Sequence, residues 1–539
     1  MDQERALVAP SPIAGPKGVR APRSVTAKAA RQKLAARASR AEPTHIAAAP
    51  SAPSPLVVPG APIPNHDRYD YQSESTFLSV ADQPLSTFSI DVDTASYSNL
   101  RRFLNDGQLP APGAVRIEEM LNYFAYHYPQ PHDGRPFSVH TELSRCPWAG
   151  GHQLLRIGLQ GRTISESDRP PANLAFLVDV SGSMNQPDKL PLLKRGLRMM
   201  THRLRDEDRV AIVVYAGSSG VVLPPTSGKL QTKIASAIES LTPGGSTNGA
   251  SGIDLAYRLV QSHFDAHAIN RVILATDGDF NVGPSSDAAL VRLIERRRES
   301  GIFLTVLGFG RGNLNDSMME KLADHGNGSY AYLDSASEAK KVLVEQIGGT
   351  LLTVAKDVKL QVEMNPRTVA AYRLIGYENR ALGTRDFADD RKDAGELGAG
   401  QSVTALYEIV PVGANDSAAS NVPLKYQTPG KITAAAGRAE LATIRLRYKL
   451  PSAPNSQLFE RAVPASLRPD SPSADQFTAA GIASFGMALR GSPDRQAASY
   501  ALAANLVRQG LCSDVGGRRA ELLALIGRAR QLAGPRLIQ

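Results

Sequence analysis

Residues 172–183 read ANLAFLVDVSGS, and this short stretch decides the class of fold. Leu174 to Val180 is an almost continuous apolar run, and polar residues follow it at once. A parallel strand that is covered on both faces has this appearance, whereas a strand with one solvated face alternates between apolar and polar residues. The stretch therefore predicts a buried central strand with oxygen-bearing side chains at its end.

The residues that follow repeat a unit of one strand and one helix. Apolar residues between Leu190 and Leu204 recur at spacings of three and four, which predicts an amphipathic helix. Further buried strands are expected at 210–215, 272–276 and 303–308, and helices at 230–241, 253–264 and 288–299. Such βα units predict an α/β fold with a doubly wound, mostly parallel sheet.

Small oxygen donors stand in three separate segments at the ends or in the loops of these units. Asp179, Ser181 and Ser183 follow the first strand, Thr247 lies in a glycine-rich loop before a helix, and Asp277 follows the strand at 272–275. Ligands of open α/β sheets bind at the carboxyl ends of the strands. Hydroxyls and carboxylates without His or Cys suit a hard cation such as Mg²⁺. The alternative is that both aspartates cap helices and the serines are ordinary loop residues.

The pattern Asp-x-Ser-x-Ser, a distant Thr and a later Thr-Asp-Gly resembles the metal-ion-dependent adhesion site of the von Willebrand factor type A (VWA) family. The resemblance implies that Ser181, Ser183 and Thr247 hold the metal through their hydroxyls. It implies that Asp179 and Asp277 act mostly through bound water and hydrogen bonds. The cofactor would be Mg²⁺ (or Mn²⁺ or Ca²⁺), and an acidic residue of a protein partner would complete the coordination. All five positions match the family pattern.

The flanking regions resemble one bacterial group of VWA proteins, over roughly residues 70–535. The stretches that carry this resemblance are 89–97, 116–120, 275–283, 308–310, 320–332 and 373–380, together with the C-terminal helices. Members of the group often begin with a secretion or lipoprotein signal, which favours the cell envelope. This chain shows no apolar stretch of signal-peptide length at its start, so its compartment stays open.

Two-residue periodicity before and after the α/β region predicts antiparallel strands. The strands at 137–160 and 357–450 are expected to meet as a single β-sandwich into which the VWA domain is inserted. The expected organisation is a disordered Ala- and Pro-rich basic tail (1–64), an N-terminal helical segment (65–135), the sandwich (136–169 with 351–450), the VWA domain (170–350) and a C-terminal helical domain (475–539).

The composition excludes several classes of protein. The formal net charge is +9, but residues 1–64 hold nine Lys or Arg against three Asp or Glu, so the rest of the chain is nearly balanced. A nucleic-acid-binding surface is therefore not expected. The sequence contains no run of 18 apolar residues, so no transmembrane helix is predicted. The two cysteines, Cys146 and Cys512, could form one disulfide but no metal cluster.

These patterns favour a protein-binding module over an enzyme. The alternative is an assembly or chaperone-like factor that works with a separate AAA+ ATPase, because the chain itself has no P-loop sequence. A metal hydrolase would need a general base near a metal-bound water, and Asp279 is the only acidic candidate.

Asp91, Asp93 and Ser96 faintly repeat the spacing of the metal motif. They could form a second cation site. The other interpretation is that they cap the following helix and hydrogen-bond its loop.

Overall fold

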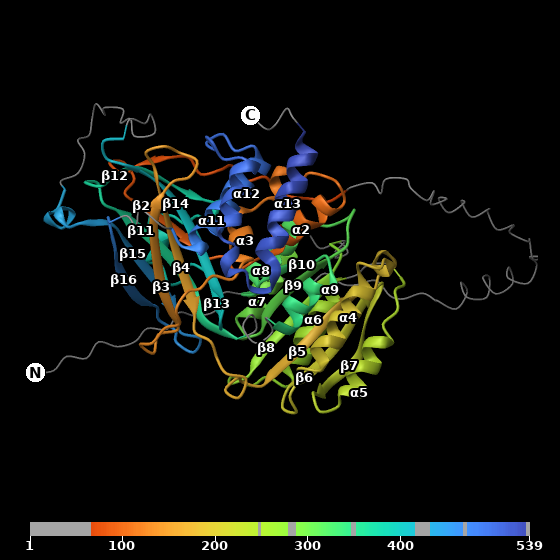
Figure 1. Cartoon of the computed structure of the whole chain (residues 1–539). Helices are drawn as coiled ribbons and strands as arrows, with labels where there is room; N and C mark the ends of the chain where they lie inside the picture. Colours follow the sequence, from red (N-terminus) through yellow and green to blue (C-terminus); the bar gives the residue numbers. More distant parts are fainter. Residues whose placement is uncertain are drawn as a thin grey trace, which may run out of the picture. The chain divides into compact units, whose positions relative to one another are not determined.

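A computed structural model describes residues 66–245, 249–278, 287–345, 352–414, 432–466 and 472–534 (Figure 1). One sheet runs in the order β10-β9-β8-β5-β6-β7. Its strands are β5 (Ala172–Asp179), β6 (Arg209–Ala216), β7 (Ser218–Ser227), β8 (Ile269–Thr276), β9 (Phe303–Phe309) and β10 (Tyr330–Leu333). All neighbours are parallel except β7, which is antiparallel to β6.

Helices cover both faces of this sheet and give it two hydrophobic cores. The helices are α4 (Leu190–Thr201), α5 (Gln231–Glu239), α6 (Gly249–Gln261), α7 (Asp287–Arg298), α8 (Asp316–His325) and α9 (Ala336–Lys340). Leu174, Phe176 and Val178 of β5 face the core shared with α4, α5 and α9, whereas Ala175 and Leu177 face the core shared with α6, α7 and α8. Burial on both faces explains why the sequence of β5 does not alternate. We call residues 172–340 the α/β domain.

Two antiparallel sheets lie before and after the α/β domain in the sequence. One has the order β1-β12-β14-β4-β3, and the other has the order β13-β11-β15-β16, with β2 also paired to β11. Their strands are β1 (Leu78–Ser79), β2 (Leu85–Ser89), β3 (Phe137–Arg145), β4 (Gln153–Gly161), β11 (Thr353–Met364), β12 (Val369–Ile375), β13 (Gly395–Gly398), β14 (Ser402–Pro411), β15 (Glu440–Lys449) and β16 (Gln457–Pro464). Strands of both sheets contribute to one hydrophobic core. The chain enters the α/β domain after β4 and returns to these sheets at β11, so the predicted insertion and fold class are confirmed.

Helices from the two ends of the described chain share a third core. They are α2 (Ala95–Asn105), α3 (Ile117–Asn122), α11 (Ala474–Arg490), α12 (Tyr500–Gln509) and α13 (Arg518–Ala533). Residues 112–114 form a separate 3₁₀ turn before α3, and α3 ends at Asn122. The side chain of Tyr123 then stacks on Tyr97 of α2, with 4.0 Å between ring centroids.

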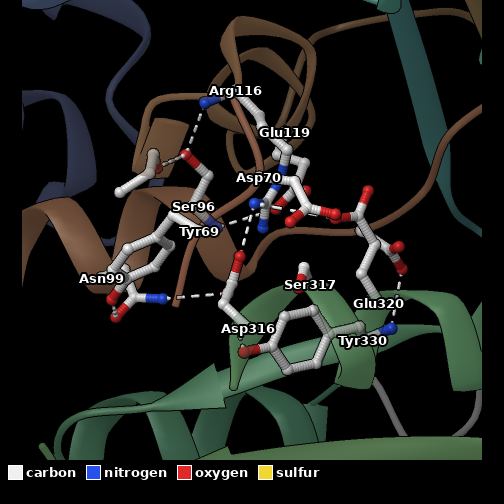
Figure 2. A network of polar contacts seen from close by, with 12 residues as sticks. Tyr69, Asp70, Ser96, Asn99, Arg116, Glu119, Asp316, Ser317, Glu320 and Tyr330 are labelled. Atoms are coloured by element: carbon white, nitrogen blue, oxygen red, sulfur yellow. Dashed lines mark hydrogen bonds and ion pairs between the residues drawn. The ribbon is translucent and has the colours of Figure 1, made fainter. Parts of the chain in front are cut away.

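A buried polar network joins the N-terminal segment to the α/β domain. Figure 2 shows Arg116 and Glu119 of the segment beside Asp316 and Tyr330 of the α/β domain. Arg116 pairs with both Glu119 and Asp316, and Tyr330 Oη donates to Asp316 Oδ1 at 2.9 Å. Asp316 is fully buried, so its charge is balanced by a residue from a distant part of the chain.

Two further expectations concern the cysteines and the membrane. Cys146 is buried, Cys512 is exposed, and both are free thiols. None of the helices in the described ranges has the length and apolar character that a membrane crossing requires.

Candidate metal centre

The carboxyl ends of two adjacent parallel strands bring the first carboxylates together. Asp179 is the last residue of β5, and Asp277 directly follows the last residue of β8, Thr276. The register pairs Val178 with Ala275, which places Asp179 next to Thr276. Thr276 Oγ1 donates a hydrogen bond of 3.2 Å to Asp179 Oδ2. The strand pairing therefore fixes the position of both acidic residues.

Asp179 is a fully buried acceptor at the centre of this group. Its Oδ1 accepts from the backbone N–H of Ser181 at 2.8 Å, and its Oδ2 accepts from Tyr215 Oη at 3.2 Å in addition to Thr276. Burial raises the pKa of Asp179 to about 6, although the hydrogen bonds from Ser181 act in the opposite direction and the charge of Asp277 adds to the rise. A positive charge nearby would favour the ionised form.

The two serines present their hydroxyls side by side. Ser181 Oγ and Ser183 Oγ are 3.0 Å apart, and Ser181 is buried while Ser183 is half-buried. The loop that carries them is joined to the glycine loop after α5, because Gly182 N donates to Gly245 O at 3.3 Å. Thr247, the fifth predicted residue, lies outside the described residues.

Asp277 has a resident cationic partner that the sequence did not indicate. Lys189 Nζ donates to Asp277 Oδ2 at 2.9 Å and to Asn313 Oδ1 at 3.1 Å. Burial would raise the pKa of Asp277, but the charge of Lys189 and a hydrogen bond from Ser183 hold it below its ordinary value. A single lysine before a helix carries no local signal of such a contact, so only the fold reveals it.

The donor set at this centre fits a hard divalent cation. Within the described ranges, no group of three or more His, Cys, Asp or Glu side chains is arranged to hold a metal ion. The donors here are instead two hydroxyls and two carboxylates, which suit Mg²⁺ and not the softer metals. Asp179 is buried with a raised pKa, and a bound cation would balance its charge. Ser181 and Ser183 would be the direct ligands among the described residues.

The second acidic pair is structural. Asp91 Oδ1 accepts from Asp93 N at 2.8 Å, and Asp93 Oδ1 accepts from Tyr330 N at 2.7 Å. The guanidinium of Arg380 pairs with both carboxylates, at 3.3 Å from Asp91 and 3.1 Å from Asp93. Ser96 donates to Ala114 O. These residues therefore organise the loop before α2, as the second interpretation expects, but they do not cap the helix: the N-cap residue of α2 is Thr94, without a side-chain cap, and Ser96 N donates to Glu119 Oε2.

Three family models match parts of the chain. The model described as von Willebrand factor type A domain matches residues 174–279, and the one described as von Willebrand factor matches residues 63–156. The model described as Uncharacterized protein YfbK, C-terminal, matches residues 349–532. The first match contains all five predicted metal-site positions.

The chain is also similar to individual proteins. The Uncharacterized protein YfbK of Escherichia coli (strain K12) is 40% identical over 502 residues, which is 91% of this chain and 83% of the relative. The human Inter-alpha-trypsin inhibitor heavy chain H3 is 28% identical over 195 residues, 34% of this chain and 22% of the relative. A solved von Willebrand factor type A structure from Catenulispora acidiphila has 16% identity and a TM-score of 0.41, covering 71% of this chain and 89% of that one. The chain belongs to the family of YfbK, and its α/β domain is a VWA domain.

Proposed function

We propose that this chain is a metal-ion-dependent protein-binding module. A divalent cation (Mg²⁺, or Mn²⁺ or Ca²⁺) would be held by the hydroxyls of Ser181, Ser183 and Thr247. Asp179 and Asp277 would act through hydrogen bonds and bound water. The cation supplies one open coordination position, and an acidic side chain of a partner protein fills it.

One observation carries this proposal. The hydroxyls of Ser181 and Ser183 lie 3.0 Å apart beside Asp179, a buried carboxylate that accepts hydrogen bonds from neutral donors: Ser181 N, Tyr215 Oη and Thr276 Oγ1. The hydroxyls of Ser181 and Ser183 would be neutral ligands, so a divalent cation that they bind directly keeps excess positive charge, which attracts a carboxylate from outside. A protein built to bind an acidic partner needs such an under-neutralised metal.

The match to the von Willebrand factor type A domain model supports a role in protein binding. The matched human protein is named as an inhibitor heavy chain, but this chain spans only 22% of it, so no partner is transferred from that name. We propose binding without catalysis. The general base that a metal hydrolase would need, Asp279, lies outside the described residues. A AAA+ ATPase as the partner stays a prediction, and such a protein would be recovered in a Mg²⁺-dependent pull-down.

The test is isothermal titration of the full chain with Mg²⁺ and Mn²⁺. Asp179→Asn keeps the size of the side chain and removes its charge, so we expect metal affinity to fall by roughly 10- to 100-fold. Ser183→Ala removes only one hydroxyl from a half-buried position and should weaken binding in the same direction. The matched control is Asp206→Asn, an exposed aspartate of the same domain, which should bind as the wild type does.

Circular dichroism shows whether each variant retains its fold. If a folded Asp179→Asn variant binds Mn²⁺ with wild-type affinity, the assignment of this centre is wrong. If the wild type and Asp206→Asn bind metal while Asp179→Asn and Ser183→Ala do not, the proposal is supported.

A further inference from the structure

Lys189 is built into the metal centre although it lies outside the metal motif. It stands directly before α4, it is 1% exposed, and its ammonium group reaches Asp277 Oδ2 at 2.9 Å and Asn313 Oδ1 at 3.1 Å. Gly310 leaves room for its side chain, because a Cβ on that residue would lie 2.0 Å from Lys189 Cε. The surrounding backbone thus accommodates this lysine closely.

The formal charges of the centre follow from these contacts. Asp179 and Asp277 contribute two negative charges. Lys189 contributes one positive charge, and its Nζ lies 2.9 Å from Asp277 Oδ2. Counted over the described residues Asp179, Asp277 and Lys189, a divalent cation gives the centre a net positive formal charge, whereas the same sum without Lys189 is zero. Interactions between charges are strong in such a buried place, because little water screens them.

We propose that Lys189 determines the ligand specificity of the centre: it makes the metal-loaded site cationic, so that the site takes an anionic ligand, and it weakens metal binding in return. This inference rests on the proposed function of the same site. It keeps the partner chemistry of that proposal, an acidic side chain, and names the residue that sets the preference for a negatively charged ligand. Lys189 acts through Asp277 and through the field at the metal, so it is a positioning residue.

The test compares Lys189→Met with the wild type in the full chain. Methionine fills similar space without charge. Removing a positive charge from the site should tighten Mn²⁺ binding by at least roughly tenfold in isothermal titration. Without metal, the variant should melt at a lower temperature, because Asp277 is buried and loses its counter-charge. Added Mn²⁺ should restore the melting temperature, which a purely structural lysine would not show.

Lys341→Met is the matched control. Lys341 is also a buried lysine next to a carboxylate, and its Nζ lies 3.5 Å from Glu338 Oε1, a residue outside the metal centre. This variant should lose stability as well. Its melting temperature should respond to Mn²⁺ no more than that of the wild type does.

Acetate is the probe for the ligand. If the loaded centre attracts anions, sodium acetate should raise the apparent Mn²⁺ affinity relative to sodium chloride at equal ionic strength, because the two ligands are linked. We expect this gain in the wild type and a smaller gain in Lys189→Met. An equal gain in both proteins would overturn the proposed role in ligand specificity.

The metal titrations separate this inference from the proposed function. If the wild type binds Mn²⁺ and Lys189→Met binds it equally or more weakly, the inference about Lys189 is overturned and the function stands. If only Lys189→Met binds Mn²⁺, both are overturned, because the native chain then has no metal-loaded site whose ligand Lys189 could select. If neither protein binds, both are overturned.

Discussion

Arg116 Nη1 lies 2.5 Å from Asp316 Oδ2, although 200 residues separate the two in sequence. The pair joins the segment before α3 to the start of α8, and Asp316 is fully buried. A buried carboxylate without its partner costs far more free energy than an exposed one. The pair therefore holds the N-terminal segment to the VWA domain.

Replacing Arg116 with methionine should destabilise the protein severely. Both Asp316 and Glu119 would keep buried charges without their guanidinium partner, so the free energy of unfolding should fall by about 3–5 kcal/mol. Urea denaturation followed by circular dichroism measures this. The matched control is Arg391→Met, whose side chain is 91% exposed beside Asp389 and whose loss should leave stability unchanged. Equal effects of the two substitutions would contradict the structural role of the Arg116 pair.

The titration of Glu118 should make the protein less stable as the pH rises from about 4.5 to about 8. This residue is 1% exposed, and burial, together with the charges of Glu378 and Asp91, raises its pKa from 4.5 to about 8. The unfolded chain releases the proton near pH 4.5, whereas the folded chain keeps it up to about pH 8. The folded state therefore binds more protons within this window, and the free energy of unfolding falls with increasing pH.

Glu118→Gln removes this titration and tests its sign. At pH 8 the variant should melt roughly 2–4 °C above the wild type, and the advantage should shrink toward pH 5. Differential scanning fluorimetry across the pH range measures the difference. Glu363→Gln, at a half-exposed carboxylate, is the control and should show no such trend. A Glu118→Gln variant that melts below the wild type by the same amount at every pH would contradict the raised pKa.

Replacing Glu408 should change both the stability of the protein and the fluorescence of its single tryptophan, Trp148, which donates a hydrogen bond to the Glu408 carboxylate. Its Oε2 accepts from Trp148 Nε1 at 2.9 Å and from Arg373 Nη2 at 2.7 Å, and its Oε1 lies 2.6 Å from His152 Nδ1. In Glu408→Gln the buried guanidinium of Arg373 loses its counter-charge, and the amide N–H₂ can avoid facing another donor only if it points to His152 and that ring takes the tautomer in which Nδ1 accepts.

We expect Glu408→Gln to lose about 3 kcal/mol of stability and to shift the tryptophan emission, because this chain has one tryptophan. Intrinsic fluorescence during urea denaturation gives both quantities at once. The surface variant Glu363→Gln again serves as the control. Unchanged emission and an unchanged midpoint would show that the Glu408 carboxylate does not organise this network.

The sequence predicted those features that depend on local pattern. Burial on both faces makes β5 a continuous apolar run, and that run identified the parallel sheet. By contrast, β16 was missed, because it lies beyond the strands expected at 357–450. Within β16 only Val463 is buried, so it lacks a periodic apolar face and is a strand through its pairing with β15. The boundaries proposed for the individual domains stay predictions.

In the candidate metal centre, too, some residues were predictable from the sequence and one was not. Asp179, Ser181, Ser183 and Asp277 were predictable, because each follows a strand whose end is fixed by the topology of the sheet, and the structure brings these four together. Lys189 was not predictable from the sequence, since its contact with Asp277 depends on how α4 begins and on the space left at Gly310. The sequence alone determined the class of sheet and the oxygen donors at its edge, because hydrophobic pattern and strand ends are local properties. Only the tertiary structure decided which charges neutralise which, because a buried charge pair depends on the distance between groups that the chain itself keeps far apart.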